Sequence, residues 1–127
     1  MKTSTLTVGR RGEDAACEYL LGHGYAVLER NWRSGHLEID IITLGSDGLH
    51  IVEVKSRVAP LMADPLCNIN AAKWRHLHRA AMAYLHSSDS SRLARDLDIW
   101  FDVVTVVFDH NRTIIEHYPK AYTPIYA

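Results

Sequence analysis

Residues 37–55 read LEIDIITLGSDGLHIVEVK. Two apolar runs rich in β-branched residues, 37–44 and 49–55, flank the turn sequence GSDG at 45–48. Glycine and aspartate tolerate the positive φ angles that tight connections between strands require. The stretch therefore predicts a β-hairpin.

Two acidic residues, Asp40 and Glu53, interrupt the apolar runs of this hairpin. A carboxylate in an apolar strand is costly unless it is paired or bound to a metal ion. Side chains alternate along a strand, so Glu38 shares a face with Asp40, and Lys55 shares one with Glu53. Pairing around the turn can bring Asp40 and Glu53 near each other. The pattern predicts that two carboxylates and a lysine converge, with Glu38 either approaching them or lying at the wet end of its strand.

Such a group of side chains suits a particular chemistry. Carboxylate oxygens favour a hard cation such as Mg²⁺, which keeps several waters and bridges to substrate phosphates. The ion polarises a phosphoryl oxygen and activates water, while a lysine orients that water or stabilises developing charge. Phosphodiester hydrolysis needs these parts. The competing interpretation is that Glu53 and Lys55 form an ordinary ion pair and that Asp40 only accepts hydrogen bonds from backbone amides.

Hydrophobic periodicity predicts the remaining elements. The run 99–108, IWFDVVTVVF, is too apolar for an edge strand and predicts a buried one. The others are helices over 13–21 and 70–86, strands near 25–28 and over 113–118, and loops over 58–68 and 87–98. The order α-β-β-β-α-β-β predicts an α/β fold, a mixed central sheet flanked by helices.

Length and composition predict a single domain spanning residues 1–127. Hydrophobic residues make up 47% of the chain and charged residues 23%, close to the globular average. No apolar run reaches the ~20 residues that span a bilayer, and the N-terminus lacks a signal-peptide segment, so no membrane partner is expected. Two cysteines predict a reduced, cytoplasmic setting. A net charge of −1 leaves any phosphate binding to local patches.

Several motifs follow one another in a specific order along the chain. They are Gly9, Gly12-Glu13, Ala16, Tyr19-Leu20, Gly24-Tyr25, Arg30-Asn31, Glu38-Ile39-Asp40-Ile41-Ile42, Val52-Glu53-Val54-Lys55-Ser56-Arg57, Lys73, Ala80-Ala81, Tyr84-Leu85 and Phe101-Asp102-Val103-Val104. On these residues the chain resembles the YraN-like family of bacterial proteins, related in fold to archaeal Holliday-junction resolvases. Asp40 with Glu53-Val-Lys55 is also similar to the signature of the PD-(D/E)xK nuclease superfamily, although no proline precedes Asp40. The resemblance implies a restriction-endonuclease-like fold with a core of about 9–118.

The resemblance also implies roles for individual residues. Asp40 and Glu53 would be ligands of Mg²⁺ or Mn²⁺, and Lys55 the catalytic lysine. Glu13 matches the position from which many superfamily members supply a further acid, although it can equally be a helix N-terminal residue favoured by the helix dipole. One departure is Leu37, where the family usually has glycine.

Basic residues near these motifs are candidates for nucleic-acid binding. Arg57, Lys73 and Arg11 are the residues we expect to contact phosphate. Arg75 and Arg79 share a helix face, for which ordinary solvation is the favoured interpretation. By analogy with resolvases, DNA is favoured over RNA and branched DNA is the first expectation. A homodimer would suit a two-fold symmetric junction.

Two other function classes compete with a metal-dependent nuclease. The first is a nucleic-acid-binding module that keeps the fold but cleaves little or nothing. The second is a protein-interaction domain with an exposed aromatic tail, Tyr118, Tyr122 and Tyr126.

Other chemistries find little support in the sequence. The eight histidines show no zinc motif and are expected to be surface or capping residues, and no phosphate-binding glycine loop is present. Cys17 is expected to pack on the first helix. Asp102 lies in an apolar strand and is expected to bond a neighbouring strand or loop.

Overall fold

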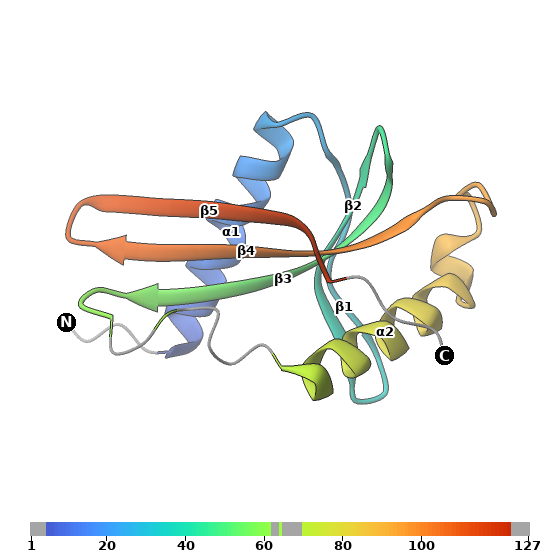
Figure 1. The fold of residues 1–127 in the computed structure, drawn as a ribbon, viewed down its shortest axis with the longest axis horizontal. Helices are drawn as coiled ribbons and strands as arrows, with labels where there is room; N and C mark the ends of the chain where they lie inside the picture. The colour runs from blue at the N-terminus through green and yellow to red at the C-terminus, as the bar shows by residue number, and fades with distance from the viewer. Residues whose placement is uncertain (1–4, 62–63, 65–69, 123–127) are drawn as a thin grey trace.

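The computed structural model describes residues 5–61, 64 and 70–122, which form helices on a five-stranded sheet (Figure 1). The elements in chain order are α1 (Thr5–Gly22), β1 (Ala26–Ser34), β2 (Leu37–Gly45), β3 (Gly48–Val58), α2 (Ala71–Leu85), the 3₁₀ turn η1 (Ser88–Ser90), β4 (Ile99–Asp109) and β5 (Arg112–Tyr122). Apart from the 3₁₀ turn, this order is the predicted α-β-β-β-α-β-β, so the expected fold class is confirmed. Within the described ranges, no helix has both the length and the apolar character that a bilayer crossing requires.

The strands lie in the order β1-β2-β3-β4-β5. Neighbouring strands are antiparallel except for β3 and β4, which are parallel and are joined through α2. A parallel pair needs a long crossover connection, and the segment that contains α2 supplies it. The predicted hairpin is confirmed, since Gly45 pairs with Gly48 across the turn. Gly48 has a φ of 130°, a conformation that favours glycine.

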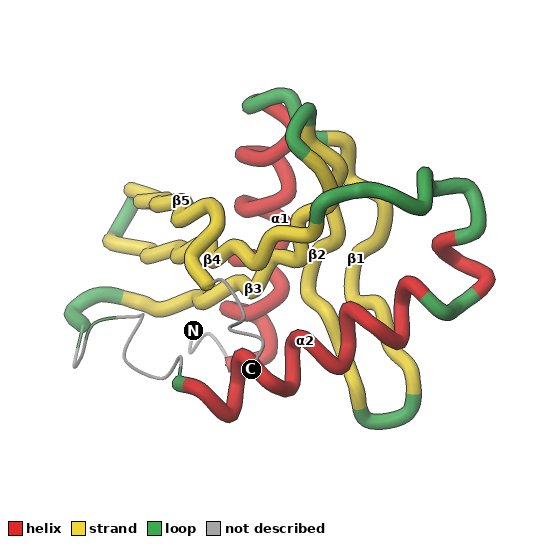
Figure 2. Tube along the Cα trace, turned by 45° about the vertical axis from the view of Figure 1, so that its right-hand side comes forward, coloured by secondary structure: helices red, strands yellow, loops and turns green. Residues whose placement is uncertain are grey.

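The two helices cover opposite faces of the sheet, which gives the molecule two cores (Figure 2). On one face Leu20 of α1 packs with Ile41 and Val52. On the other face Leu77 of α2 packs with Ile42 and Ile51. We refer to these as the α1-side core and the α2-side core. Because both faces are covered, the sequences of β3 and β4 are nearly continuous apolar runs. The prediction that 99–108 forms a buried strand is confirmed by β4.

α1 is longer than its apolar periodicity predicted, beginning at Thr5 instead of residue 13. Its added turns bury Val8 and Gly12, and a Cβ on Gly12 would overlap the side chain of Ser56 in β3. A glycine that packs by lacking a side chain leaves no apolar signal, so the pattern missed these turns. Cys17 is buried in the α1-side core, which confirms its predicted packing.

β5 is also longer than predicted, and this overturns the interpretation of an exposed aromatic tail. Tyr118 and Tyr122 pack against the α2-side core, and the Tyr122 ring stacks on Trp74 with centroids 4.7 Å apart. Because β5 continues to Tyr122, both rings are held on the sheet instead of projecting from it. Tyr126 lies outside the described residues.

Candidate functional site

The first predicted acid, Asp40, lies where β2 and β3 separate. The antiparallel pairing of these strands runs from their turn to Ile41 and Val52. Beyond that pair, Oδ2 of Asp40 accepts a 2.8 Å hydrogen bond from the backbone N–H of Val54. The Asp40 side chain thus takes the place of a backbone acceptor where the pairing of β2 with β3 ends. The alternative interpretation of the sequence, in which Asp40 accepts a hydrogen bond from a backbone amide, is therefore correct about this contact.

The second acid, Glu53, is buried beside two lysines. Its side chain is 8% exposed, and its Oε1 lies 3.6 Å from Nζ of Lys55 and 3.3 Å from Nζ of Lys73. Lys73 comes from the first turn of α2, where its backbone N–H donates a 3.0 Å hydrogen bond to Oδ1 of the N-cap Asn70. Two ammonium groups from different elements therefore face one carboxylate oxygen.

The electrostatics of Asp40 reflect both its burial and its acidic neighbours. Burial raises the pKa of Asp40 to about 7, with further increases from the carboxylates of Glu53 and Glu13. The hydrogen bond from Val54 and the charge of Lys73 act in the opposite direction but do not outweigh burial. A carboxyl group with such a pKa favours an added positive charge, whether a proton or a cation.

The donor set fits a magnesium-like ion. Mg²⁺ is commonly held by one or two carboxylates and keeps waters or substrate phosphates in its other positions. Asp40 and Glu53 would supply two carboxylates from adjacent strands. Across the described residues, no three His, Cys, Asp or Glu side chains lie close enough together to enclose an ion.

Glu13 of α1 and Asp40 of β2 line the same cleft, which has a volume of about 750 Å³. The cleft opens between α1 and the β1–β2 hairpin. Glu38, predicted either to approach the site or to lie at the wet end of β2, also lines it and is exposed, 3.5 Å from Nε of Arg33. The structure thus brings Glu13 and Asp40 into one cleft and places Glu38 at its rim.

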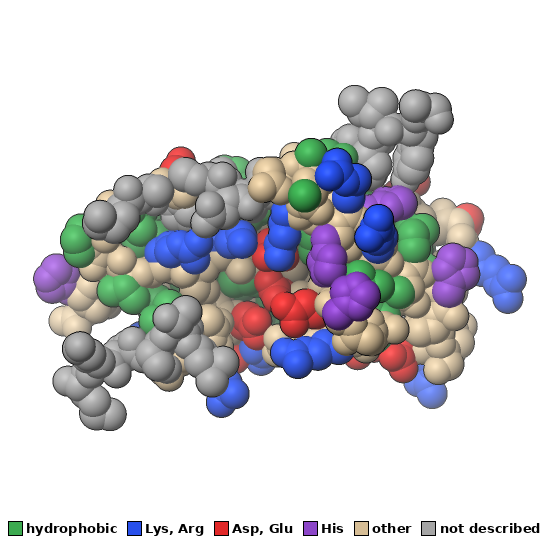
Figure 3. Space-filling view, turned by 90° about the horizontal axis from the view of Figure 1, so that it is seen from below, with side chains coloured by type: hydrophobic (Ala, Val, Ile, Leu, Met, Phe, Trp, Pro, Cys, Tyr) green, Lys and Arg blue, Asp and Glu red, His purple; other side chains and the backbone are tan. Residues whose placement is uncertain are grey.

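The predicted phosphate contacts occupy different places. Lys73 lies in the carboxylate site itself, beside Glu53. Arg57 is half-buried and its Nη1 donates a 2.7 Å hydrogen bond to the Ser56 carbonyl. Arg11 is exposed, with its guanidinium 4.4 Å from the centre of the Phe108 ring. Figure 3 shows acidic side chains gathered near the middle of one face, with Lys and Arg side chains on both sides of them.

Arg75 and Arg79 are both exposed on α2, in agreement with the solvated helix face that the sequence favoured. His23 and His86 each donate from Nδ1 to a carbonyl four residues earlier, so the capping role predicted for histidines is correct for these two. The same prediction is wrong for His50, which is completely buried.

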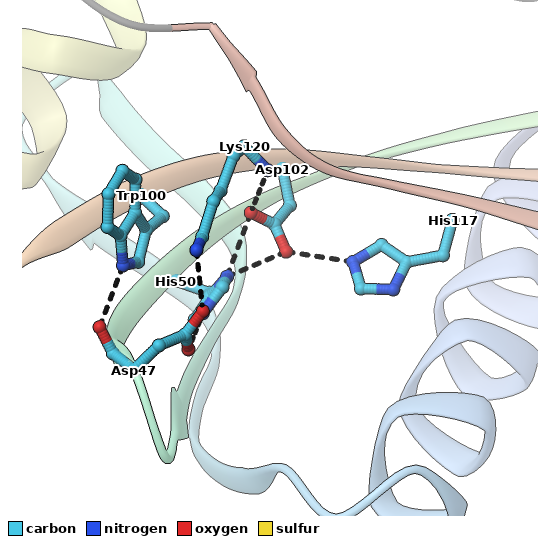
Figure 4. Close-up of polar contacts among 6 residues, drawn as sticks. All are labelled: Asp47, His50, Trp100, Asp102, His117 and Lys120. Carbon is cyan, nitrogen blue, oxygen red and sulfur yellow. Dashed lines mark hydrogen bonds and ion pairs between the residues drawn. The ribbon is translucent and has the colours of Figure 1, made fainter.

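His50 belongs to a polar network at the opposite end of the β2–β3 hairpin (Figure 4). Its Nδ1 donates to the buried Asp102 at 2.8 Å and its Nε2 to Asp47 at 2.7 Å. Nε2 of His117 donates to the same Asp102 carboxylate at 2.8 Å, and the backbone N–H of Lys120 at 3.1 Å. The prediction that Asp102 bonds a neighbouring element is confirmed: it joins the hairpin to β4 and β5.

The charges of this network follow from its hydrogen bonds. Burial alone would raise the pKa of Asp102, but the bonds from His117 and His50 outweigh it and lower that pKa. The bond from His50 is the main reason that the pKa of Asp47 falls to about 2. Burial opposes a charged His50 ring, yet the two carboxylates raise its pKa. The ring of His50 therefore lies between two carboxylates and joins the hairpin turn to β4. The only signal in the sequence was Asp102, an acid in an apolar strand that needed a partner.

Comparisons with known proteins give one consistent family. The family described as "Uncharacterised protein family UPF0102" matches residues 12–106. A UPF0102 protein of Bacteroides thetaiotaomicron is 38% identical over 117 residues, which cover 92% of this chain and 93% of that protein. A UPF0102 protein of Chlorobium chlorochromatii is 44% identical over 103 residues, covering 81% of this chain and 76% of that protein. The family match contains Asp40, Glu53, Lys55 and Lys73.

Proposed function

The chain belongs to the uncharacterised protein family UPF0102, and from this premise we propose that it is a metal-dependent nuclease that hydrolyses phosphodiester bonds. The observation that carries the proposal is the meeting of Asp40 and Glu53 with two lysine ammonium groups where β2 and β3 separate. Burial raises the pKa of Asp40 and so makes its ionised form costly to the folded protein, and a bound cation would offset that cost. The similarity to the PD-(D/E)xK signature supports the same conclusion.

Asp40 and Glu53 would hold the ion, and Glu13 would add negative charge from α1. When bound, Mg²⁺ or Mn²⁺ supplies Lewis-acid stabilisation of a phosphoryl oxygen. Hydrolysis adds water across a P–O bond, so the attacking oxygen loses a proton and the leaving oxygen gains one. Lys55, a donor with no lone pair when charged, holds the attacking water or stabilises the negative charge that develops on the phosphoryl group. Lys73 of α2 lies near the same Glu53 carboxylate as Lys55 and so adds a second positive charge to the site.

The substrate that we propose is DNA, with branched or flapped forms tested first. We do not propose that the protein recognises a particular base sequence, because cleavage at a metal site needs only the phosphodiester backbone. This substrate class comes by analogy with resolvases of similar signature.

The test is cleavage of end-labelled linear, flapped and four-way-junction DNA and of RNA, in Mg²⁺, Mn²⁺ or EDTA. Asp40→Asn and Lys55→Met are compared with the wild type, and Glu18→Gln, which changes an exposed acid of α1, is the control. We expect metal-dependent cleavage in the wild type and in the control. Both site variants should lose it while unfolding as cooperatively as the wild type.

Two results would overturn the proposal. Cleavage that survives Asp40→Asn would place the chemistry elsewhere. Wild-type protein that binds nucleic acid but cleaves no substrate in either metal would identify the binding module instead.

A further inference from the structure

The cleft that ends at Asp40 is lined by arginines on both walls. Arg10 lies on its α1 wall, and Arg30 and Arg33 lie on its β1 wall. Arg30 and Arg33 were not among the predicted phosphate contacts. A volume of about 750 Å³ falls in the range of pockets that enclose ligands of modest size. Such a cleft has room for a short stretch of one nucleic-acid strand.

Carboxylates hold two of these guanidinium groups in place. Nη2 of Arg30 lies 2.6 Å from Oδ1 of Asp14, and Nε of Arg33 lies 3.5 Å from Oε2 of Glu38. All four side chains are at least 38% exposed, so these ion pairs are solvated and contribute little to stability. Guanidinium groups bind phosphate in the same two-pronged geometry as carboxylate. Phosphates can therefore replace Asp14 and Glu38 at small cost.

A bend in the hairpin gives the cleft its shape. Ile39 packs in the α2-side core and Ile41 in the α1-side core, although residues two apart on a regular strand point to the same face. β2 thus changes side at Asp40, which lies between them. Opposite it in β1, Asn31 has a left-handed φ of 51°, a conformation that asparagine tolerates well. Asn31 also lines the cleft, so the bend and the arginines belong to one feature.

We propose that this cleft binds a single strand of the nucleic-acid substrate, with Arg10, Arg30 and Arg33 contacting its phosphates. The strand passes between α1 and the β1–β2 hairpin and delivers a phosphodiester to Asp40. This proposal rests on the proposed nuclease function and narrows its substrate to nucleic acid with a single-stranded segment, such as a flap.

The test measures binding in EDTA, where cleavage is blocked, by the fluorescence anisotropy of a labelled single strand as salt is varied. Arg33→Gln should weaken binding several-fold and reduce the slope of log K against log salt by ~0.7, the value for one phosphate contact on a single strand. Asp14→Asn should have the opposite effect and strengthen binding, because it frees Arg30. Arg92→Gln is the control, since this exposed arginine precedes Leu93 on the α2 side of the sheet. It should leave affinity and salt slope unchanged.

The outcomes separate this proposal from the nuclease proposal. Suppose that the wild type cleaves DNA in Mn²⁺, but that Arg33→Gln and Arg92→Gln change its affinity for single strands equally. This result would contradict the proposal that the cleft binds the strand, and it would not contradict the proposed nuclease function. Equal affinity for a single strand and a blunt duplex of the same sequence would also overturn the cleft proposal. Loss of affinity in Arg33→Gln with a gain in Asp14→Asn would support the cleft, even in a wild type that proves unable to cleave. Parallel titrations with RNA identify which nucleic acid the cleft prefers.

Discussion

Replacing Asp40 with asparagine should make the metal-free protein more stable while removing one of the two proposed metal ligands. The pKa of Asp40 is raised from 3.8 to about 7, mainly by burial and then by Glu53. At a pH above 7, the ionised carboxylate therefore costs the folded state up to about 4 kcal/mol. Asparagine has a similar shape and carries no charge. It also keeps an oxygen that can accept the hydrogen bond from Val54.

The sign of the pH dependence follows from the direction of the shift. A carboxyl group whose folded pKa is raised binds its proton more tightly in the folded state. The wild type therefore loses stability as the pH rises from about 4 to about 7, and the loss is complete above that window. We expect the advantage of Asp40→Asn to be near zero at pH 4 and to reach up to about 4 kcal/mol at pH 8.

Urea unfolding in EDTA across this pH range measures the effect, with Asp96→Asn, an exposed loop acid, as the control. Adding Mn²⁺ should then reduce the stability advantage of Asp40→Asn. An ion at 100 times its dissociation constant stabilises only the wild type, by ~2.7 kcal/mol. An Asp40→Asn variant that is no more stable than the wild type at pH 8 in EDTA would contradict this prediction, because Asp40 would then carry no electrostatic cost.

Two further predictions concern the fold. Asp102→Asn breaks the buried network of His50 and should lower the free energy of unfolding by about 3–5 kcal/mol, measured in urea. Because the pKa of His50 is raised, the stabilisation from its charged form is complete below about pH 6.5 and declines as the pH rises through the raised pKa. If Asp102→Asn lowered the free energy of unfolding equally at every pH, that result would argue against a charged ring. Gly12→Ala should cost about 1–3 kcal/mol, since its Cβ would overlap Ser56, whereas Gly22→Ala has open space and should be close to neutral. Thermal unfolding of both variants, and of Gly12→Ala combined with Ser56→Gly as a rescue, tests this packing.

The fold was predictable where local chemistry and tertiary structure agree. The helix expected over 70–86 is α2, with Asn70 as its N-cap and His86 as its C-cap. The turn at 45–48 has the glycines that a tight connection needs. The pattern missed the first turns of α1, because close packing of Gly12 on Ser56 involves no apolar side chain.

Prediction of the candidate site depended on strand alternation. Alternation along β3 predicted that Lys55 lies on the same side as Glu53, and pairing around the turn predicted that Asp40 lies near Glu53. The change of side of β2 at Asp40 was not predicted. Lys73 was expected to contact phosphate, and its position beside Glu53 depends on how α2 crosses the sheet, which no local pattern contains. The same holds for His50, whose two carboxylate partners lie on its own hairpin turn and on β4.

The separation of β2 from β3 also bears on self-association. Among the described residues, β3 pairs on both sides only as far as Val52, whereas its pairing with β4 continues to Val58. The second half of this central strand thus has the character of a sheet edge, and exposed edges tend to recruit strands from other molecules. Lys55 and Arg57 lie in that half, and charged residues on an edge act as gatekeepers against aggregation. Replacing both residues together with apolar residues should therefore promote aggregation.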